Sequence, residues 1–377
     1  MFDNAARVAV FCSLLLGVCQ WVYGADSEYL HEPRISARVM GMGGAFTALA
    51  DDYNALYYNP AGLAGRDKGE LNLEITAGLT PTLLNFYNSL STAGTSSVAI
   101  TNLLESNYGA HYSSRVGLGM TYVGKGWGFG IQPADVTVEM DIHQLSGGAV
   151  GLEAFNDTLV QVGFGWQIGK SFSFGLAPKS VYRGFIEKEL LALDLIQSSN
   201  ILRTSDASEG LTFDTDFGTM YTFDVPDSWW VKPTLALAVR NVVDEGFPTD
   251  LHLYSGGSSN ITNPDGNLGR RIDVGTRFEL PEFWAFKPRY LLDFRDIGYR
   301  YVSFKKSLHT GFELPWKASD LVTGAYRVGY SEGYFTAGFS FNLIFLTLDL
   351  ATYSEEIGTT NAPKESRRYI AQFSMDF

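Results

Sequence analysis

The last nine residues of the chain, 369–377, read YIAQFSMDF and alternate between two kinds of side chain. One face is apolar and is formed by Tyr369, Ala371, Phe373, Met375 and Phe377. The other face is mixed and carries Ile370, Gln372, Ser374 and Asp376. Successive side chains of a β-strand point to opposite sides. The stretch therefore predicts a strand whose two faces meet different surroundings.

The same alternation recurs along the chain in about fourteen segments. They cover residues 70–79, 112–123, 127–143, 155–168, 171–186, 211–223, 233–243, 271–280, 286–296, 304–314, 320–330, 333–342, 344–353 and 367–377. Gly, Ser, Thr and Arg fill the positions between the apolar ones. An apolar outer face and a polar lumen are what a membrane barrel requires. We predict an all-β transmembrane outer-membrane β-barrel of about 14 antiparallel strands.

The connections between these segments support a barrel over a soluble β-sandwich, which is the alternative. Tight turns, such as Gly124-Lys125-Gly126 and Gly169-Lys170, alternate with longer loops. Long loops on one side and short turns on the other are typical of outer-membrane barrels. Two long connections, 82–106 and 187–200, have apolar residues at helical spacing and predict helices outside the cell. Those helices would either collect an apolar ligand or pack on the barrel rim.

Tryptophans lie close to the ends of the predicted strands. Trp127, Trp229, Trp230, Trp284 and Trp316 occupy such positions, whereas Trp166 is interpreted as mid-strand. Aromatic residues gather where a membrane protein meets the lipid–water interface. The pattern predicts an interfacial belt; buried core tryptophans are the alternative.

Composition excludes several classes of protein. The 377 residues carry a net charge of −13, which opposes nucleic-acid binding. Their mean hydropathy of −0.02 excludes a polytopic helical membrane protein. A membrane barrel remains compatible, because its alternating residues average to neutral.

The N-terminus predicts a secretory signal peptide over residues 1–24, cleaved after Gly24. An apolar run, 8–22, follows Arg7 and contains Cys12 and Cys19, the two cysteines of the chain. A membrane anchor and a lipoprotein signal are the alternatives. Cleavage would leave no thiol for a disulfide or a metal site. The chain is therefore expected to be exported, and the predicted barrel would place it in a cell outer membrane of the Gram-negative type.

Residues 25–65 interrupt the strand pattern and predict an N-terminal plug, with the barrel spanning 66–377. Residues 41–52 read GMGGAFTALADD, and residues 57–64 read YYNPAGLA. Glycines allow close packing and unusual backbone angles, while Asn59-Pro60 ends a short helix. A compact segment of small residues suits the inside of a barrel wide enough to leave a lumen.

These two motifs resemble the N-terminal hatch of the FadL-like outer-membrane transport family, which also includes PorV-like proteins and spirochaetal FadL-like proteins. The resemblance implies a hatch plugging a fourteen-stranded barrel. It also implies passive uptake of hydrophobic molecules, long-chain fatty acids above all, through the lumen. Asn59, Pro60 and Ala61 match the hatch turn, and Gly41, Gly43 and Gly44 are the accompanying hatch glycines. Two alternatives stay open: a PorV-like role in binding or assembling a secreted partner, and a simple porin.

Three further sets of residues are candidates for function. The first is Gln132-Pro133-Ala134, because proline breaks a strand's hydrogen-bond ladder and would open the wall sideways; a harmless bulge is the alternative. The second is the set of lumen arginines Arg240, Arg277, Arg295 and Arg327, with Asp293 and Glu279 on the same inward faces. They would form ion pairs around the hatch or hold a ligand's carboxylate. The third is Phe377, a terminal aromatic of the kind recognised by the barrel-assembly machinery.

Catalytic and metal motifs give no positive signal. The five histidines have no ligand spacing, and no nucleophile elbow, phosphate loop or dinucleotide fingerprint is complete. We therefore expect no enzyme activity, no catalytic residues, no metal and no cofactor; an outer-membrane phospholipase or protease with a triad assembled from distant residues is the alternative. The expected partners are a hydrophobic small molecule or fatty acid and the lipid of the outer membrane around a monomer.

Overall fold

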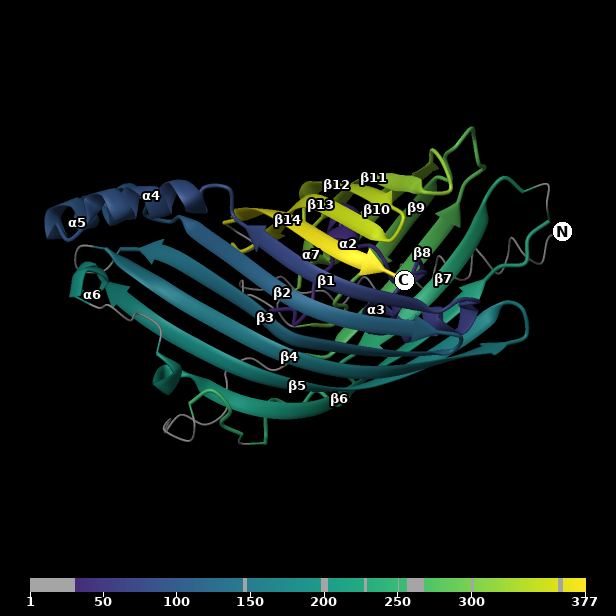
Figure 1. Ribbon diagram of the computed structural model, residues 1–377, viewed down its shortest axis with the longest axis horizontal. Helices are drawn as coiled ribbons and strands as arrows, with labels where there is room; N and C mark the ends of the chain where they lie inside the picture. Colours follow the sequence, from purple (N-terminus) through teal and green to yellow (C-terminus); the bar gives the residue numbers. More distant parts are fainter. Residues whose placement is uncertain are drawn as a thin grey trace.

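The chain folds into one closed β-barrel. The computed structural model describes residues 31–144, 148–197, 203–226, 229–249, 251–255, 268–299, 302–358 and 362–377. Fourteen strands follow one another around the barrel in sequence order, and the last pairs with the first (Figure 1). The predicted fold class is confirmed. The predicted signal peptide lies outside the described residues.

The strands differ greatly in length. They are β1 Glu70–Leu79, β2 His111–Gly124, β3 Trp127–His143, β4 Ala149–Ile168, β5 Phe172–Leu191, β6 Ser208–Thr222, β7 Lys232–Arg240, β8 Arg271–Glu279, β9 Arg289–Phe294, β10 Leu308–Lys317, β11 Val322–Ser331, β12 Tyr334–Leu343, β13 Leu346–Glu356 and β14 Glu365–Asp376. Strands β2 to β6 are the long ones and extend beyond the rest at one end (Figure 1).

The two faces of each strand separate as the sequence predicts. On β14, Tyr369, Phe373 and the following Phe377 are exposed, while Gln372 and Ser374 are buried inside the barrel. Antiparallel pairing with β1 places Gln372 opposite Thr76, which is also buried. Apolar side chains thus cover the outside of the barrel, where lipid replaces water.

The long connections lie at one end of the barrel and carry the helices α4 Leu83–Ala93, α5 Ser97–Ser106 and α6 Ala192–Gln197 (Figure 1). The predicted helices over 82–106 are confirmed. The predicted helix over 187–200 is wrong in its first part, because residues 187–191 continue β5 and pair with β4 as far as Ala149. Strand pairing overrides the local helical pattern there. We call this end the loop end and the opposite one the turn end.

The tryptophans form a belt at the turn end. Trp127 begins β3, Trp229 and Trp230 precede β7, Trp284 lies in the β8–β9 turn, and Trp316 is near the end of β10. Trp166 also lies at this end, two residues before the end of β4, so its interpretation as mid-strand is wrong. Among the described residues, the tryptophans mark one membrane interface.

Residues 31–65 lie inside the barrel. They form the helices α2 Ala37–Gly41 and α3 Ala55–Tyr58 and the 3₁₀ helix η2 Pro60–Gly65. Helix α2 packs on β12 and β13, and η2 packs on β4, β5 and β6, so the segment spans the lumen from wall to wall. We call residues 31–65 the hatch. No helix in the described part of the chain is long and apolar enough to cross a membrane.

Candidate functional site: the hatch and the lumen

The hatch fits the barrel wall so closely that glycines are needed on both sides of the contact. Gly43 has a φ of +68°, and a Cβ there would lie 2.7 Å from the carbonyl oxygens of Thr310 and Tyr330. On the wall, a Cβ on Gly311 would lie 2.9 Å from the Cβ of Met42. These glycines let the two backbones approach at distances that any side chain would prevent.

The side chain of Asn59 forms hydrogen bonds within the hatch and to the barrel wall. Its side-chain oxygen accepts a hydrogen bond from the Ala61 amide at 3.1 Å and so caps η2. Its side-chain amide donates to the carbonyl of Thr47 at 2.8 Å and to that of Thr219 on β6 at 3.4 Å. The turn of Asn59, Pro60 and Ala61 is therefore a buried docking element of the hatch.

The wall also holds the hatch backbone through Asp293 of β9. One carboxylate oxygen of Asp293 accepts hydrogen bonds from the amides of Phe46 and Thr47, each at 2.8 Å. Asp293 is fully buried and faces inward, as the sequence predicts. This contact fixes the middle of the hatch against β9.

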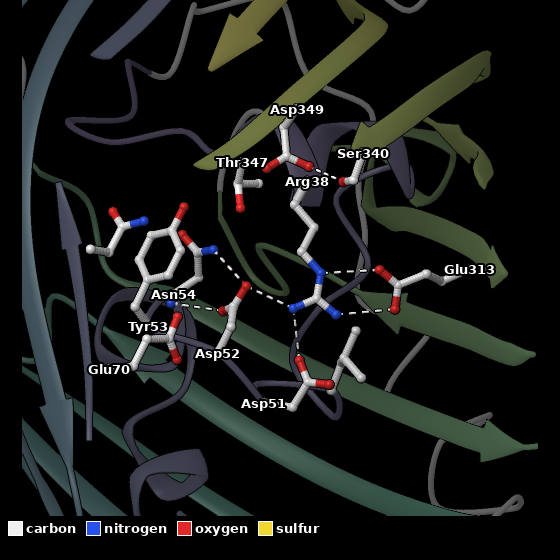
Figure 2. A network of polar contacts seen from close by, with 12 residues as sticks. Arg38, Asp51, Asp52, Tyr53, Asn54, Glu70, Glu313, Ser340, Thr347 and Asp349 are labelled. Atoms are coloured by element: carbon white, nitrogen blue, oxygen red, sulfur yellow. Dashed lines mark hydrogen bonds and ion pairs between the residues drawn. The ribbon is translucent and has the colours of Figure 1, made fainter. Parts of the chain in front are cut away.

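Arg38 of α2 joins three carboxylates, two from the hatch and one from the wall (Figure 2). Its guanidinium makes two 3.0 Å hydrogen bonds to Glu313 of β10 and reaches Asp51 at 2.8 Å and Asp52 at 2.7 Å. Burial opposes the ionisation of Asp51, yet Arg38 and Arg289 together hold its pKa well below the usual range. We call these residues the Arg38 network. They fasten the hatch to β9 and β10 at the turn end.

A second charged site surrounds Glu32, near the start of the hatch. Its carboxylate pairs with Arg271 and lies 2.7 Å from Arg295 and 3.6 Å from Arg240. Arg115 donates to the Glu32 backbone carbonyl at 2.8 Å. We call Arg115, Arg240, Arg271 and Arg295 the four-arginine cluster. Burial alone would raise the pKa of Glu32, but the cluster, Arg271 first, holds it well below its usual range.

The predicted lumen arginines divide between sites. Arg240 and Arg295 join the four-arginine cluster, whereas Arg327 pairs with Glu313 and Asp349 beside the Arg38 network. Arg277 contacts Glu279 at 3.3 Å and the hatch carbonyl of Leu49 at 3.4 Å. All four make ion pairs near the hatch, and their contact with a ligand stays a prediction. Arg115 and Arg271 were missed, although both occupy inward positions of their strands.

Pro133 breaks the ladder of β3, as predicted, but the wall is not open there. On the β4 side, Pro133 and Ala134 together face Thr158, and on the β2 side, Gln132 and Pro133 together face Gly119, so the register shifts at Pro133 on both sides. The side chains of Gln132 and Asp135 hydrogen-bond to each other behind the bulge. Pairing resumes on both sides, so a lateral opening at this point stays a prediction about movement.

Cavities lie on both sides of the hatch. The loop-end cavity, about 100 Å³, is lined by Glu32, Arg271, Arg295, Lys306 and Ile35, among others. The turn-end cavity, about 400 Å³, borders the Arg38 network and Trp316. Residues of the hatch line both cavities and lie between them.

The loop-end helices pack against the outside of the long strands. Phe86, Ile100 and Leu104 are buried against apolar side chains of β2, β3, β4 and β5. Leu84, Tyr87 and Val98 on the same helices remain exposed. The helices therefore pack on the rim and still present apolar surface.

Comparison with solved structures shows which proteins share this fold. The crystal structure of the toluene transporter TodX from Pseudomonas putida matches with a TM-score of 0.53 and 12% identity, covering 93% of this chain and 99% of TodX. The fold is that of TodX. A TodX monoaromatic hydrocarbon channel deltaS2 mutant matches with a TM-score of 0.51 and 12% identity, over 91% of this chain and 97% of the mutant.

A FadL homologue from Pseudomonas aeruginosa is more distant. It has a TM-score of 0.45 and 10% identity, over 94% of this chain and 99% of the homologue. No protein-family model and no curated protein sequence matches the chain. These structural neighbours are transport channels rather than enzymes. Within the described residues, no group of three acidic, His or Cys side chains is placed to hold a metal ion.

Proposed function

We propose that this protein is an outer-membrane channel for passive uptake of hydrophobic molecules, with long-chain fatty acids as the expected substrate. The observation that carries the proposal is a hatch filling the lumen of a barrel with the fold of a toluene transporter. A plug docked through small residues and ion pairs blocks free diffusion of polar solutes. It also leaves a route that opens when the hatch moves.

The proposed path starts at the loop end, where exposed Leu84, Tyr87 and Val98 offer apolar surface. The molecule enters the loop-end cavity, the hatch shifts, and release follows at the turn end or sideways at the Pro133 bulge. The remaining steps are proposals of the same kind: export after cleavage at Gly24, assembly through Phe377, and a monomer in the outer membrane. No catalytic step or cofactor is part of this mechanism.

Uptake by whole cells tests the proposal. Cells of a Gram-negative host without its own fatty-acid transporter would express the protein and receive radiolabelled oleate, toluene or a polar sugar. We expect rapid entry of oleate or toluene and no added entry of the sugar. Sugar entry without hydrophobic uptake would contradict the proposal and favour a porin.

A disulfide between hatch and wall supplies a reversible control. A Cβ on Gly41 would lie 3.6 Å from the Cβ of Ala351 on β13, within the range that disulfides span. That Cβ would also lie 2.9 Å from the Cα of Gly338, so α2 must shift slightly to admit it. In the double variant Gly41→Cys, Ala351→Cys, uptake should fall under oxidising conditions and return after reduction. Equal uptake with and without the crosslink would contradict hatch movement.

A further inference from the structure

We infer that the four-arginine cluster is a carboxylate-binding site and that Glu32 of the hatch occupies it as an internal stand-in for the substrate's carboxylate. The inference rests on the proposed function and adds to it the residues that bind the anionic head group and the part of the hatch that this head group displaces. The cluster lies where the hatch meets the loop-end cavity. An incoming carboxylate would take the place of Glu32 and so release the first part of the hatch.

Charge balance is the first argument. Around Glu32, Arg115 pairs with Asp135 at 2.7 Å, and Arg240 pairs with Asp273 at 2.8 Å. Asp296 lies 3.6 Å from Arg271 and 3.9 Å from Arg240. Glu32 joins the described carboxylates Asp135, Asp273 and Asp296 in this buried place, so its departure would leave the four guanidiniums with less compensating negative charge. A buried excess charge is costly, so the empty site would favour another anion.

The geometry around the Glu32 carboxylate is the second argument. Arg271, Arg295 and Arg240 all approach the same oxygen, Oε1, from β8, from the end of β9 and from the end of β7. The other oxygen, Oε2, is buried and has no hydrogen-bond partner within the described residues. A wall that offers guanidiniums from three strands to one oxygen is suited to planar oxyanions in general.

Apolar side chains also line the cavity, beside the charged ones. Ile35, Met40 and Tyr353 line the same cavity as Glu32, and Ile35 and Tyr353 belong to an apolar cluster with Ile370. Two other carboxylates that line the cavity have partners outside the cluster. Glu355 pairs with Arg368 at 2.9 Å, and Glu356 accepts a hydrogen bond from Tyr334 at 2.8 Å.

Equilibrium binding to the full chain in detergent tests the inference, with oleate and oleyl alcohol as probes that differ in the head group. Glu32→Gln removes the internal carboxylate and keeps its size. We expect this variant to bind oleate about tenfold more tightly or better, and oleyl alcohol as the wild type does. Glu313→Gln is the matched control, because it loosens the hatch at the Arg38 network and leaves Glu32 in its place. It should not favour oleate over oleyl alcohol.

Arg295→Gln is a second variant that probes the same site from the wall. It should weaken oleate binding and leave oleyl alcohol binding unchanged. The inference is overturned if Glu32→Gln changes both ligands alike, or if neither Glu32→Gln nor Arg295→Gln alters the preference for oleate. Absence of binding of both ligands to the wild type and every variant would overturn the proposed function as well. The two failures are thus distinguishable.

Discussion

At the scale of single residues, Arg38 links the hatch to the wall through Glu313. Arg38→Gln would leave buried Glu313 still paired with Arg327 at 2.9 Å, so the loss should stay below the cost of an unpaired buried charge, which is about 3–5 kcal/mol. We expect weaker hatch docking, seen as higher and noisier conductance in planar bilayers. Lys287→Gln is the control, because its pair with Glu282 is exposed and contributes little. Equal conductance of the Arg38 variant and the wild type would contradict this role.

Substitutions at Gly43 and Gly109 distinguish the effect of close packing from the effect of backbone strain. Both have positive φ, +68° and +78°, but a Cβ on Gly109 would meet nothing within 4 Å. Gly109→Ala should therefore cost only the strain, about 1–2 kcal/mol, and leave conductance unchanged. Gly43→Ala adds overlap with the backbone of β10 and β11 and should raise conductance. If both variants behaved alike, the tight fit of the hatch would not matter for sealing.

At the scale of elements, the bulge in β3 is the feature whose role is open to test. Deleting Pro133 would remove the extra residue and give β3 the regular register of its neighbours. If the bulge serves lateral release, the deletion should lower oleate uptake severalfold while barrel assembly, judged by gel mobility, stays normal. Pro133→Val, which keeps the extra residue, is the matched control. Unchanged uptake after the deletion would leave the bulge without a transport role.

Alternation predicts elements well where a strand separates lipid from lumen. The alternation along β14 predicts which side chains point outward and which point inward, because lipid on one side and the hatch on the other constrain every residue. The pattern fails at 187–191, where Leu190 and its neighbours have helical spacing but pair with β4.

The sequence places Arg240 and Arg295 in the lumen, yet the gathering of arginines around Glu32 depends on the register between distant strands. Local patterns carry no information about that register.

At the scale of the whole molecule, docking of the hatch should depend on pH through His31. Its Nε2 atom lies 3.0 Å from Asp157 of β4, and its ring stacks on Phe155 at 4.2 Å. Burial lowers the pKa of His31 to about 4, against about 6.5 for a free histidine. Between pH 6.5 and pH 4, His31 is therefore protonated when the hatch is undocked and neutral when it is docked. Docking should therefore weaken by up to about 3 kcal/mol over this window, with no effect above it.

Conductance between pH 7.5 and 4.5 measures this effect, with His31→Gln as the comparison. The wild type should open more as the pH falls, and the variant should show a smaller change. Burial raises the pKa of Glu332 to about 7, so its contribution to stability increases as the pH falls, opposite to that of His31. Both proteins carry Glu332, so it does not affect the comparison. An identical pH profile for the two proteins would contradict a role for His31.

The central claim is that a movable hatch admits apolar molecules into this barrel. The most direct test is mass spectrometry of small molecules that co-purify with the native protein, comparing the wild type with Asn59→Ala. The claim predicts a stoichiometric fatty acid or other apolar molecule in the wild type and its loss in the variant, because Asn59 joins the hatch turn to Thr47 and Thr219. A stoichiometric protein partner without any apolar molecule would contradict it and support an assembly role.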